Sequence, residues 1–346
     1  MIEILQRWAG GEQPSSEELE KLTGEECRDR GRIAAFGITP EGARDAIRRR
    51  SHLLISLLRE NPDLPILSEQ LKTLWTLWLP LGIQLAELRQ TLGRPPVQGI
   101  LGGQGTGKTT LATVLSRVLA LLDYRTLSLS IDDLYKTYAE RQHLREADPR
   151  LIWRGPPGTH DIDLGISVLD QLRHPTPGER VAVPRFDKSL WNGGGDRTEP
   201  EWVTGIDVVL FEGWFVGCHP VDGGIFEMAP APIVTEGDRQ FARDMNHKLQ
   251  DYLPLWERLD RLMVLNPVDY RLSKQWRRQA ENEMKAAGRS GMTDGEIEQF
   301  VDYFWKSLHP ELFILPLVED RDRVDLVVDI EADHSVGRVY RPGTWG

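Results

Sequence analysis

Four residues at fixed spacing indicate a phosphate-binding loop. Gly102, Gly107, Lys108 and Thr109 fit the pattern G-x-x-x-x-G-K-[ST] between a short apolar segment and a run of helix formers. Glycine lets the backbone turn its N–H groups toward an anion, and the following helix adds the positive end of its dipole. We expect nucleotide phosphates to contact Gly102, Gly103, Gln104, Gly105, Thr106, Gly107, Lys108, Thr109 and Thr110.

Two of these side chains have separate chemical roles in such a loop. Lys108 would reach the β- and γ-phosphates, and the Thr109 hydroxyl would bind Mg²⁺. The structural alternative is a glycine-rich turn between a strand and a helix, with a lysine in solvent.

Carboxylates follow two apolar segments further along the chain. Asp132 and Asp133 come directly after residues 125–131, and Glu212 comes near the end of the apolar run 207–213. Ligands of open α/β sheets bind at the carboxyl ends of strands, so these acids are placed for chemistry. Glu212 has the position of a carboxylate that acts on the metal or its water. The alternative for the aspartates is a helix N-cap, and we expect one of the two to be structural.

Two further stretches are rich in glycine and polar residues. Residues 153–161 contain His160, and residues 187–197 contain Lys188, three glycines and Arg197. The second stretch could close over an anionic acceptor, or it could be a flexible hairpin tip. His160 could instead simply cap a helix.

Five apolar runs predict β-strands: 97–101, 125–131, 207–213, 259–265 and 323–330. The phosphate loop and the acidic residues lie at the ends of the first three of them. Helical segments separate them, which predicts an α/β fold with the doubly wound parallel sheet of P-loop NTPases and helical insertions. Residues 179–186 are expected to be extended.

Helices are expected on both sides of that domain. The segments 41–60 and 69–92 are amphipathic, and Gly93-Arg94-Pro95-Pro96 marks a boundary after them. An Arg-rich helix is expected over 270–287, and Thr293 with Glu296 forms a capping box for the next one. We therefore expect an N-terminal helical extension over 1–94 and a nucleotide-binding domain over 95–346.

Composition limits the classes of partner. The chain has 346 residues and a formal charge of −11, which argues against a nucleic-acid partner. Hydrophobic residues make up 40% and charged residues 27%, as in an ordinary globular protein. Cys27 and Cys218 do not form a C-x-x-C pair, so we expect neither disulfides nor a zinc site.

The apolar run 74–83 is too short to span a membrane, and the N-terminus resembles no targeting signal. We expect a cytoplasmic protein without a membrane partner. The oligomeric state stays open.

Taken together, these motifs resemble those of the D-glycerate 3-kinase family of plants and cyanobacteria. That family lies within a group of P-loop kinases that includes uridine kinase, phosphoribulokinase and pantothenate kinase. The resemblance spans about residues 97 to 331 and is carried by residues 130–135, 154–161, 183–189, 193–197, 210–214, 276–281 and 291–294. Leu134 and Asp187 depart from it, where the family has Phe and Asn.

This resemblance implies that the chain uses ATP and Mg²⁺ to phosphorylate D-glycerate at its 3-hydroxyl, giving 3-phospho-D-glycerate. Asp132 would then orient or deprotonate the hydroxyl, and Glu212 would hold the hydration shell of the metal. Arg277 or Arg278 would cover the phosphates, and Arg277 is the one that matches the family's arginine.

The acceptor site is implied in the same way. The carboxylate of glycerate needs a forked cation, for which Arg185 and Arg197 are the candidates, with Lys188 behind them. The residues expected around the acceptor are Asp133, Tyr135, Arg154, His160, Arg185, Lys188 and Arg197.

Two other functions stay open at this point. A related kinase acting on a nucleoside or on pantothenate would share the catalytic residues, whereas a P-loop regulatory or assembly NTPase would share only the phosphate site. The guanine-specific sequence N-K-x-D is absent.

Overall fold

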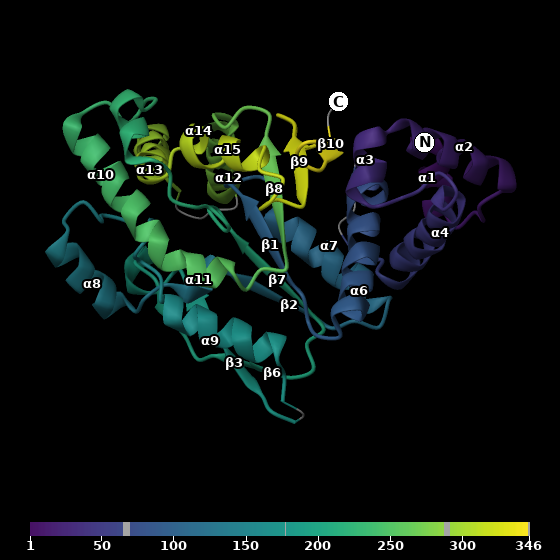
Figure 1. Ribbon diagram of the computed structural model, residues 1–346, viewed down its shortest axis with the longest axis horizontal. Coiled ribbons are helices and arrows are strands. Elements are labelled where there is room, and N and C mark those ends of the chain that lie inside the picture. Colours follow the sequence, from purple (N-terminus) through teal and green to yellow (C-terminus); the bar gives the residue numbers. More distant parts are fainter. Residues whose placement is uncertain (65–69, 177, 287–290, 345–346) are drawn as a thin grey trace.

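A six-stranded sheet forms the centre of the molecule (Figure 1). The computed structural model describes residues 1–64, 70–176, 178–286 and 291–344. The strand order is β10-β9-β8-β1-β7-β2, and every neighbouring pair is parallel except β10 with β9. The strands are β1 Val97–Gly102, β2 Thr126–Ser130, β7 Val208–Gly213, β8 Arg261–Pro267, β9 Leu326–Ile330 and β10 Val336–Tyr340. The predicted α/β fold is confirmed, with an antiparallel edge strand, β10, that the apolar runs did not indicate.

Successive residues of the central strands point to opposite faces and build two cores. Ile100 and Leu210 face one core together with α7 and the N-terminal helices, whereas Leu101 and Phe211 face the other together with α9 and α11. The helices after β1 are α7 Lys108–Ala120, α8 Tyr138–Ala147, α9 Ile162–Arg173, α10 Glu236–Lys248, α11 Leu253–Trp256, α12 Leu272–Ala286, α13 Asp294–Ser307, α14 Pro310–Phe313 and α15 Leu315–Val318.

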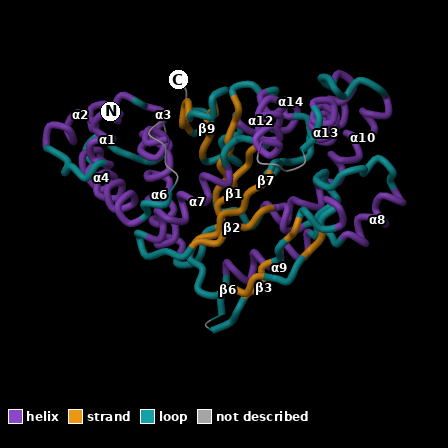
Figure 2. Tube along the Cα trace, turned by 180° about the vertical axis from the view of Figure 1, so that it is seen from behind, coloured by secondary structure: helices purple, strands orange, loops and turns teal. Residues whose placement is uncertain are grey.

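The first part of the chain is helical, as predicted. Its helices are α1 Ile2–Ala9, α2 Ser16–Arg28, α3 Arg30–Ala35, α4 Ala43–Glu60, α5 Leu71–Thr73 and α6 Leu79–Leu92. In both Figures 1 and 2 they lie at one end of the molecule, with α8, α10 and α13 at the other. Helix α6 ends at Gly93, whose φ of 65° gives a left-handed cap, and β1 starts at Val97. The division into an extension and a nucleotide-binding domain stays a prediction.

The expected helix over 69–92 differs in one detail, and residue 69 lies outside the described residues. Leu74–Trp78 forms a π-helix between α5 and α6, and the Leu79 N–H donates to the Leu74 carbonyl. Pro80 follows, and it can neither donate to the carbonyl four residues earlier nor fit against it. The wider turn accommodates this proline at the start of α6.

Two short strand pairs around the expected acceptor loop form two-stranded sheets separate from the central sheet. β3 (Val181–Val183) pairs with β6 (Glu201–Val203), and β4 (Phe186–Asp187) pairs with β5 (Asp196–Arg197). The extended segment expected over 179–186 is thus two short strands, and residues 187–197 form the end of a hairpin.

The predicted C-terminal helices are also present. The Arg-rich helix is α12, whose expected end at residue 287 lies outside the described residues. The capping box of Thr293 and Glu296 at the start of α13 is confirmed. No helix within the described ranges is long and apolar enough to cross a membrane.

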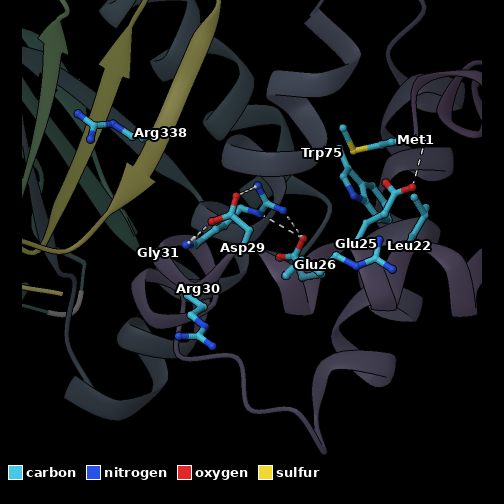
Figure 3. Close-up of a pocket in the computed structure, with 11 residues that line it drawn as sticks. Met1, Leu22, Glu25, Glu26, Asp29, Arg30, Gly31, Trp75 and Arg338 are labelled. Atoms are coloured by element: carbon cyan, nitrogen blue, oxygen red, sulfur yellow. Dashed lines mark hydrogen bonds and ion pairs between the residues drawn. The ribbon is translucent and has the colours of Figure 1, made fainter. Parts of the chain in front are cut away.

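A cavity of about 610 Å³ opens among the N-terminal helices and is lined by Glu26, Trp75 and the β10 residue Arg338, among others (Figure 3). None of the site residues expected from the sequence lines it. Beside it, the buried Glu26 carboxylate pairs with the buried Arg50 at 3.0 Å and with Arg32 at 3.1 Å. Arg50 also lies over the Trp75 ring, 5.1 Å from its centroid.

We expect Glu26→Gln to lower the free energy of unfolding by about 3–5 kcal/mol, because it leaves the buried Arg50 cation without a counter-charge. Burial alone would raise the pKa of Glu26, but Arg50 and Arg32 hold it below its usual value. The stabilisation is therefore complete above the unfolded-state pKa and disappears as the pH falls through the folded-state pKa.

Urea unfolding at several pH values measures the effect, and the difference from the wild type should shrink in acid. Glu25→Gln is the control, because the Glu25 side chain is 31% exposed and its ion pair, with the α-amino group of Met1, is long at 3.8 Å. Equal losses for both variants would contradict the assignment.

Candidate active site

The glycine-rich loop connects the end of β1 to the start of α7. Gly105 and Gly107 have φ values of 80° and 85°, a region that side chains other than glycine rarely adopt. The Lys108 ammonium donates to the carbonyl oxygens of Gly102 at 2.7 Å and Gly103 at 2.9 Å, which holds the loop around it. Burial lowers the pKa of Lys108.

The amino end of α7 is suited to an anion. Helices α2, α8, α10 and α13 each begin with a side-chain capping box, whereas the N-cap of α7 is Gly107, and no described side chain caps it. The first N–H groups of a helix have no partner within the helix, so those of Lys108, Thr109 and Thr110 point outward. Thr109 and Thr110 are exposed. These donors fit a phosphate group.

Four charged side chains gather at the carboxyl ends of β1, β2 and β7. Glu212 pairs in register with Ser130 of β2, directly before the 3-10 helix Ile131–Leu134 that contains Asp132. The Lys108 ammonium lies 4.0 Å from the Glu212 carboxylate, and the Lys188 ammonium lies 2.6 Å from Asp132. Adjacent strands therefore bring together residues that are far apart in the sequence.

The two neighbouring aspartates have different surroundings. Burial raises the pKa of Asp132, but the Lys188 ammonium and the Tyr135 hydroxyl that donates to it more than compensate, so its pKa is lowered and the group is ionised. Asp133 instead accepts the Ser130 N–H at 3.0 Å as part of a capping box, and it pairs with Arg185 at 3.0 Å. Burial raises its pKa. This geometry matches the expectation that one of the pair is structural.

Tyr135 and His160 stack beside Asp132, with ring centroids 4.6 Å apart. His160 is 1% exposed, and burial lowers its pKa to about 3, so its ring is neutral. The Tyr252 hydroxyl oxygen lies 2.7 Å from His160 Nδ1 and accepts the backbone N–H of Gly158 at 2.9 Å.

We assign the tautomer of His160 from these contacts. Among the described residues, His160 Nδ1 is the one acceptor in contact with the Tyr252 hydroxyl, so Tyr252 directs its own proton to Nδ1. Nδ1 then accepts, and Nε2 carries the hydrogen. Nε2 is buried and has no hydrogen-bond partner among the described residues. His160 thus holds a neutral, unused donor close enough to Asp132 to be affected by its charge.

The two arginines expected to bind the substrate carboxylate already hold protein carboxylates. Arg185 pairs with Glu201 at 2.6 Å as well as with Asp133. Arg197 pairs with Asp161 at 2.8 Å and donates to the Tyr135 carbonyl at 2.8 Å. Both therefore fix the backbone around Asp132 and Tyr135.

Arg154 has a different environment. Its guanidinium donates to the carbonyl oxygens of Gly193 at 2.7 Å and Gly194 at 3.2 Å, and it lies 5.9 Å from the Tyr135 ring centroid. Arg141 donates to the Gly194 and Gly195 carbonyls. Within the part of the chain that the structure describes, neither arginine forms an ion pair, so the carbonyl oxygens at the end of the hairpin contact two cations that no carboxylate pairs with directly.

Helix α12 places its two arginines differently. Arg277 donates to the Gln104 side chain of the phosphate loop at 3.4 Å and pairs with Glu281 at 2.6 Å. Arg278 instead lies 3.5 Å from Asp294 and 3.8 Å from Glu298. Arg277 is the arginine that contacts the loop.

The metal site expected at Thr109 and Glu212 has few protein ligands. No group of three or more His, Cys, Asp or Glu side chains in the described ranges could hold a metal by itself. Magnesium sites in kinases have this composition, because phosphate oxygens and water complete the coordination. The hydroxyl of the exposed Thr109 and the Glu212 carboxylate, which lies 4.0 Å from the Lys108 ammonium, are suitable ligands for such a site.

Several residues around the site were not indicated by the sequence motifs. Arg141, Tyr252 and His334 lie outside every pattern considered, and only the tertiary structure brings them to the site. The capping role of Asp133 had a sequence signal, since Ser130 lies three residues before it.

No family model matches the chain, but individual proteins do. It is 34% identical over 254 residues to the chloroplastic D-glycerate 3-kinase of Arabidopsis thaliana, covering 70% of this chain and 54% of that protein. The chain thus spans only about half the length of the plant enzyme. It is also 34% identical over 220 residues to the uncharacterized kinase mug58 of Schizosaccharomyces pombe, covering 61% of this chain and 79% of that one.

The fold gives the same result. The structure of D-glycerate 3-kinase from Cryptococcus neoformans matches with a TM-score of 0.69 and 27% identity, over 76% of this chain and 97% of that one. The matches in sequence and in fold agree with the phosphate loop and the acidic strand ends described above. This chain therefore belongs to the D-glycerate 3-kinase family of P-loop kinases.

Proposed function

We propose that this chain transfers the γ-phosphoryl group of ATP to the 3-hydroxyl of D-glycerate. The observation that carries this proposal is the cluster of Lys108, Glu212, Asp132 and Lys188, which brings the phosphate loop next to the residues expected around the acceptor. A regulatory or assembly NTPase has no acceptor substrate and therefore does not need Asp132 and Lys188. The names of two relatives support glycerate as the acceptor.

Positioning and charge neutralisation supply most of the catalysis in phosphoryl transfer. Lys108 and the N–H groups at the start of α7 hold the phosphate chain, and Arg277 covers it from α12. Mg²⁺ bound through Thr109 and Glu212 supplies further positive charge at the phosphate oxygens. Lys188 adds a cation on the acceptor side.

Asp132 orients the attacking hydroxyl. Its low pKa makes it a weak base, so its main contribution is to accept the hydroxyl hydrogen bond and hold the oxygen in line. The acceptor hydroxyl would replace Lys188 or Tyr135 as a partner of this carboxylate. His160 Nε2 offers a neutral donor to a second oxygen of the same small molecule, because it is otherwise an unpaired buried group.

The carboxylate of glycerate binds Arg154 in this proposal. Arg185 and Arg197 are occupied by Glu201, Asp133 and Asp161, whereas the hydrogen bonds of Arg154 within the described residues go to carbonyl oxygens. Arg154 belongs to the acceptor wall because it lies against Tyr135, whose hydroxyl reaches Asp132. Residues 187–197 connect Asp132 with Arg154, because Lys188 contacts Asp132 and Gly193 contacts Arg154.

Coupled release of ADP over a panel of small hydroxylated acceptors tests the function. D-Glycerate should be the preferred acceptor, with little ATP hydrolysis in its absence, and phosphorus NMR should show the 3-phosphate. Preference for uridine or pantothenate, or formation of the 2-phosphate, would leave only the wider P-loop kinase assignment. ATP hydrolysis at a rate that no acceptor changes would favour an NTPase.

Arg154→Ala should raise the KM for D-glycerate by about 10- to 140-fold and leave the KM for ATP nearly unchanged. The range corresponds to about 1.5–3 kcal/mol for one charge-assisted contact. Steady-state kinetics with glycerol as a second acceptor provides the control, because glycerol lacks the carboxylate and should lose no affinity. If Arg197→Ala gives the selective loss and Arg154→Ala does not, the carboxylate belongs at Arg197.

We further propose that the protein acts in the cytoplasm, on a small-molecule substrate, without a nucleic-acid or membrane partner. Both cysteines are free, and the net charge is −11. Fractionation of cells that express a tagged chain tests the compartment.

A further inference from the structure

The arrangement of the sheet fixes the side on which a bound nucleoside leaves the phosphate loop. The loop follows β1, and the acceptor groups Asp132 and Glu212 lie at the ends of β2 and β7, on one side of β1. In-line transfer directs the γ-phosphoryl group toward that side. The base must then extend to the other side, above the ends of β8 and β9.

A flat aromatic surface is present there. His334, in the turn between β9 and β10, stacks on Trp276 of α12 with centroids 4.7 Å apart and an interplanar angle of 29°. Trp276 is buried, and its indole N–H donates to the Ala332 carbonyl at 3.1 Å. His334 itself is exposed, and one face of its ring contacts Trp276.

This pair is attached to the phosphate loop itself. His334 Nδ1 lies 2.9 Å from the Gly105 carbonyl oxygen, and since a carbonyl can only accept, Nδ1 is the donor. A Cβ at Gly105 would lie 2.6 Å from Trp276, so the loop and the tryptophan are in close contact. His334 holds a φ of 65°, which is uncommon outside glycine and indicates that the surroundings fix this position.

We infer that the exposed face of His334, supported by Trp276, is the surface on which the purine base of the nucleotide stacks. Aromatic rings accept nucleobases on their faces, and a histidine supported by a buried indole loses little freedom when a base binds. Val268, at the end of β8, adds an apolar side chain that is 52% exposed on the same side. This inference rests on the proposed use of ATP and assigns the nucleoside half of that site.

Equilibrium binding of ADP and of inorganic pyrophosphate, both with Mg²⁺, separates stacking from support of the loop. His334→Ala should weaken ADP about 5- to 100-fold, the range for loss of one stacked base, and leave pyrophosphate unchanged. His334→Phe keeps a ring without the hydrogen bond and should recover most of the ADP affinity. His334→Asn can keep a donor for Gly105 at a positive φ but has no ring, so it should behave like the alanine variant.

Equal weakening of ADP and pyrophosphate would overturn the inference, because it would mean that His334 only supports the loop. Unchanged ADP affinity in the alanine variant would overturn it as well. This outcome differs from a failure of the proposed function. If the wild-type protein binds ADP tightly but does not phosphorylate glycerate, the proposed function fails, and the binding test of His334 still applies.

Discussion

Lys108→Ala should lower kcat/KM by about 10³-fold or more, with the fold intact. Removing one preorganised donor from a developing negative charge costs about 10²–10³ in rate, and Lys108 also contributes a full charge. Its ammonium lies between the carbonyls of Gly102 and Gly103 and the Glu212 carboxylate, at the point where the β- and γ-phosphates would bind. ADP release and circular dichroism, measured together, separate a lost function from a lost fold.

The matched control for this prediction is Lys21→Ala. Lys21 is an exposed lysine of α2, far from the loop in sequence and outside every contact described here, so its loss should change neither activity nor stability. ADP should raise the Tm of the wild type and of the Lys21 variant but not that of the Lys108 variant. Near-normal turnover without Lys108 would refute the nucleotide site at this loop.

Much of the fold and of the phosphate site could be predicted because the signals are local. The loop 102–109 combines a fixed spacing with backbone conformations that only glycine adopts easily, and the acid after 207–211 follows a run that reads as a buried strand. Strand β10 escaped prediction because Val336 and Val339 are separated by an irregular register. The π-helix before Pro80 also had no periodic signal.

Assignment of the acceptor arginines could not follow from the sequence for a physical reason. Every arginine can form a bidentate contact, and which ones remain available depends on the carboxylates that the fold places beside them. Arg197 pairs with Asp161, 36 residues away, while Arg154 forms no ion pair among the described residues and donates to carbonyl oxygens. The same applies to His334 and Gly105, which are 229 residues apart in the chain.

Asp132→Asn should lower kcat by about 10²–10⁴-fold, the range for a positioned acid–base group, with a much smaller change in the KM for ATP. The amide keeps the shape and an oxygen that can accept from Tyr135, but it removes the charge that holds Lys188 at 2.6 Å. The substitution therefore affects phosphoryl transfer in two ways. The acceptor hydroxyl loses the carboxylate that orients it, and the Lys188 ammonium loses its counter-charge. Single-turnover kinetics, with chemistry separated from product release, measures the effect.

Asp133→Asn is the matched comparison, since it makes the same chemical change at the next residue. Its carboxylate caps the 3-10 helix through the Ser130 N–H and pairs with Arg185, so its loss should reduce stability more than kcat. The two variants should therefore separate cleanly, with Asp132 lowering the rate of the chemical step and Asp133 lowering the Tm. If Asp133→Asn instead gave the larger loss in kcat, the two roles would have to be exchanged. The acceptor would then bind on the Arg185 side of this short helix.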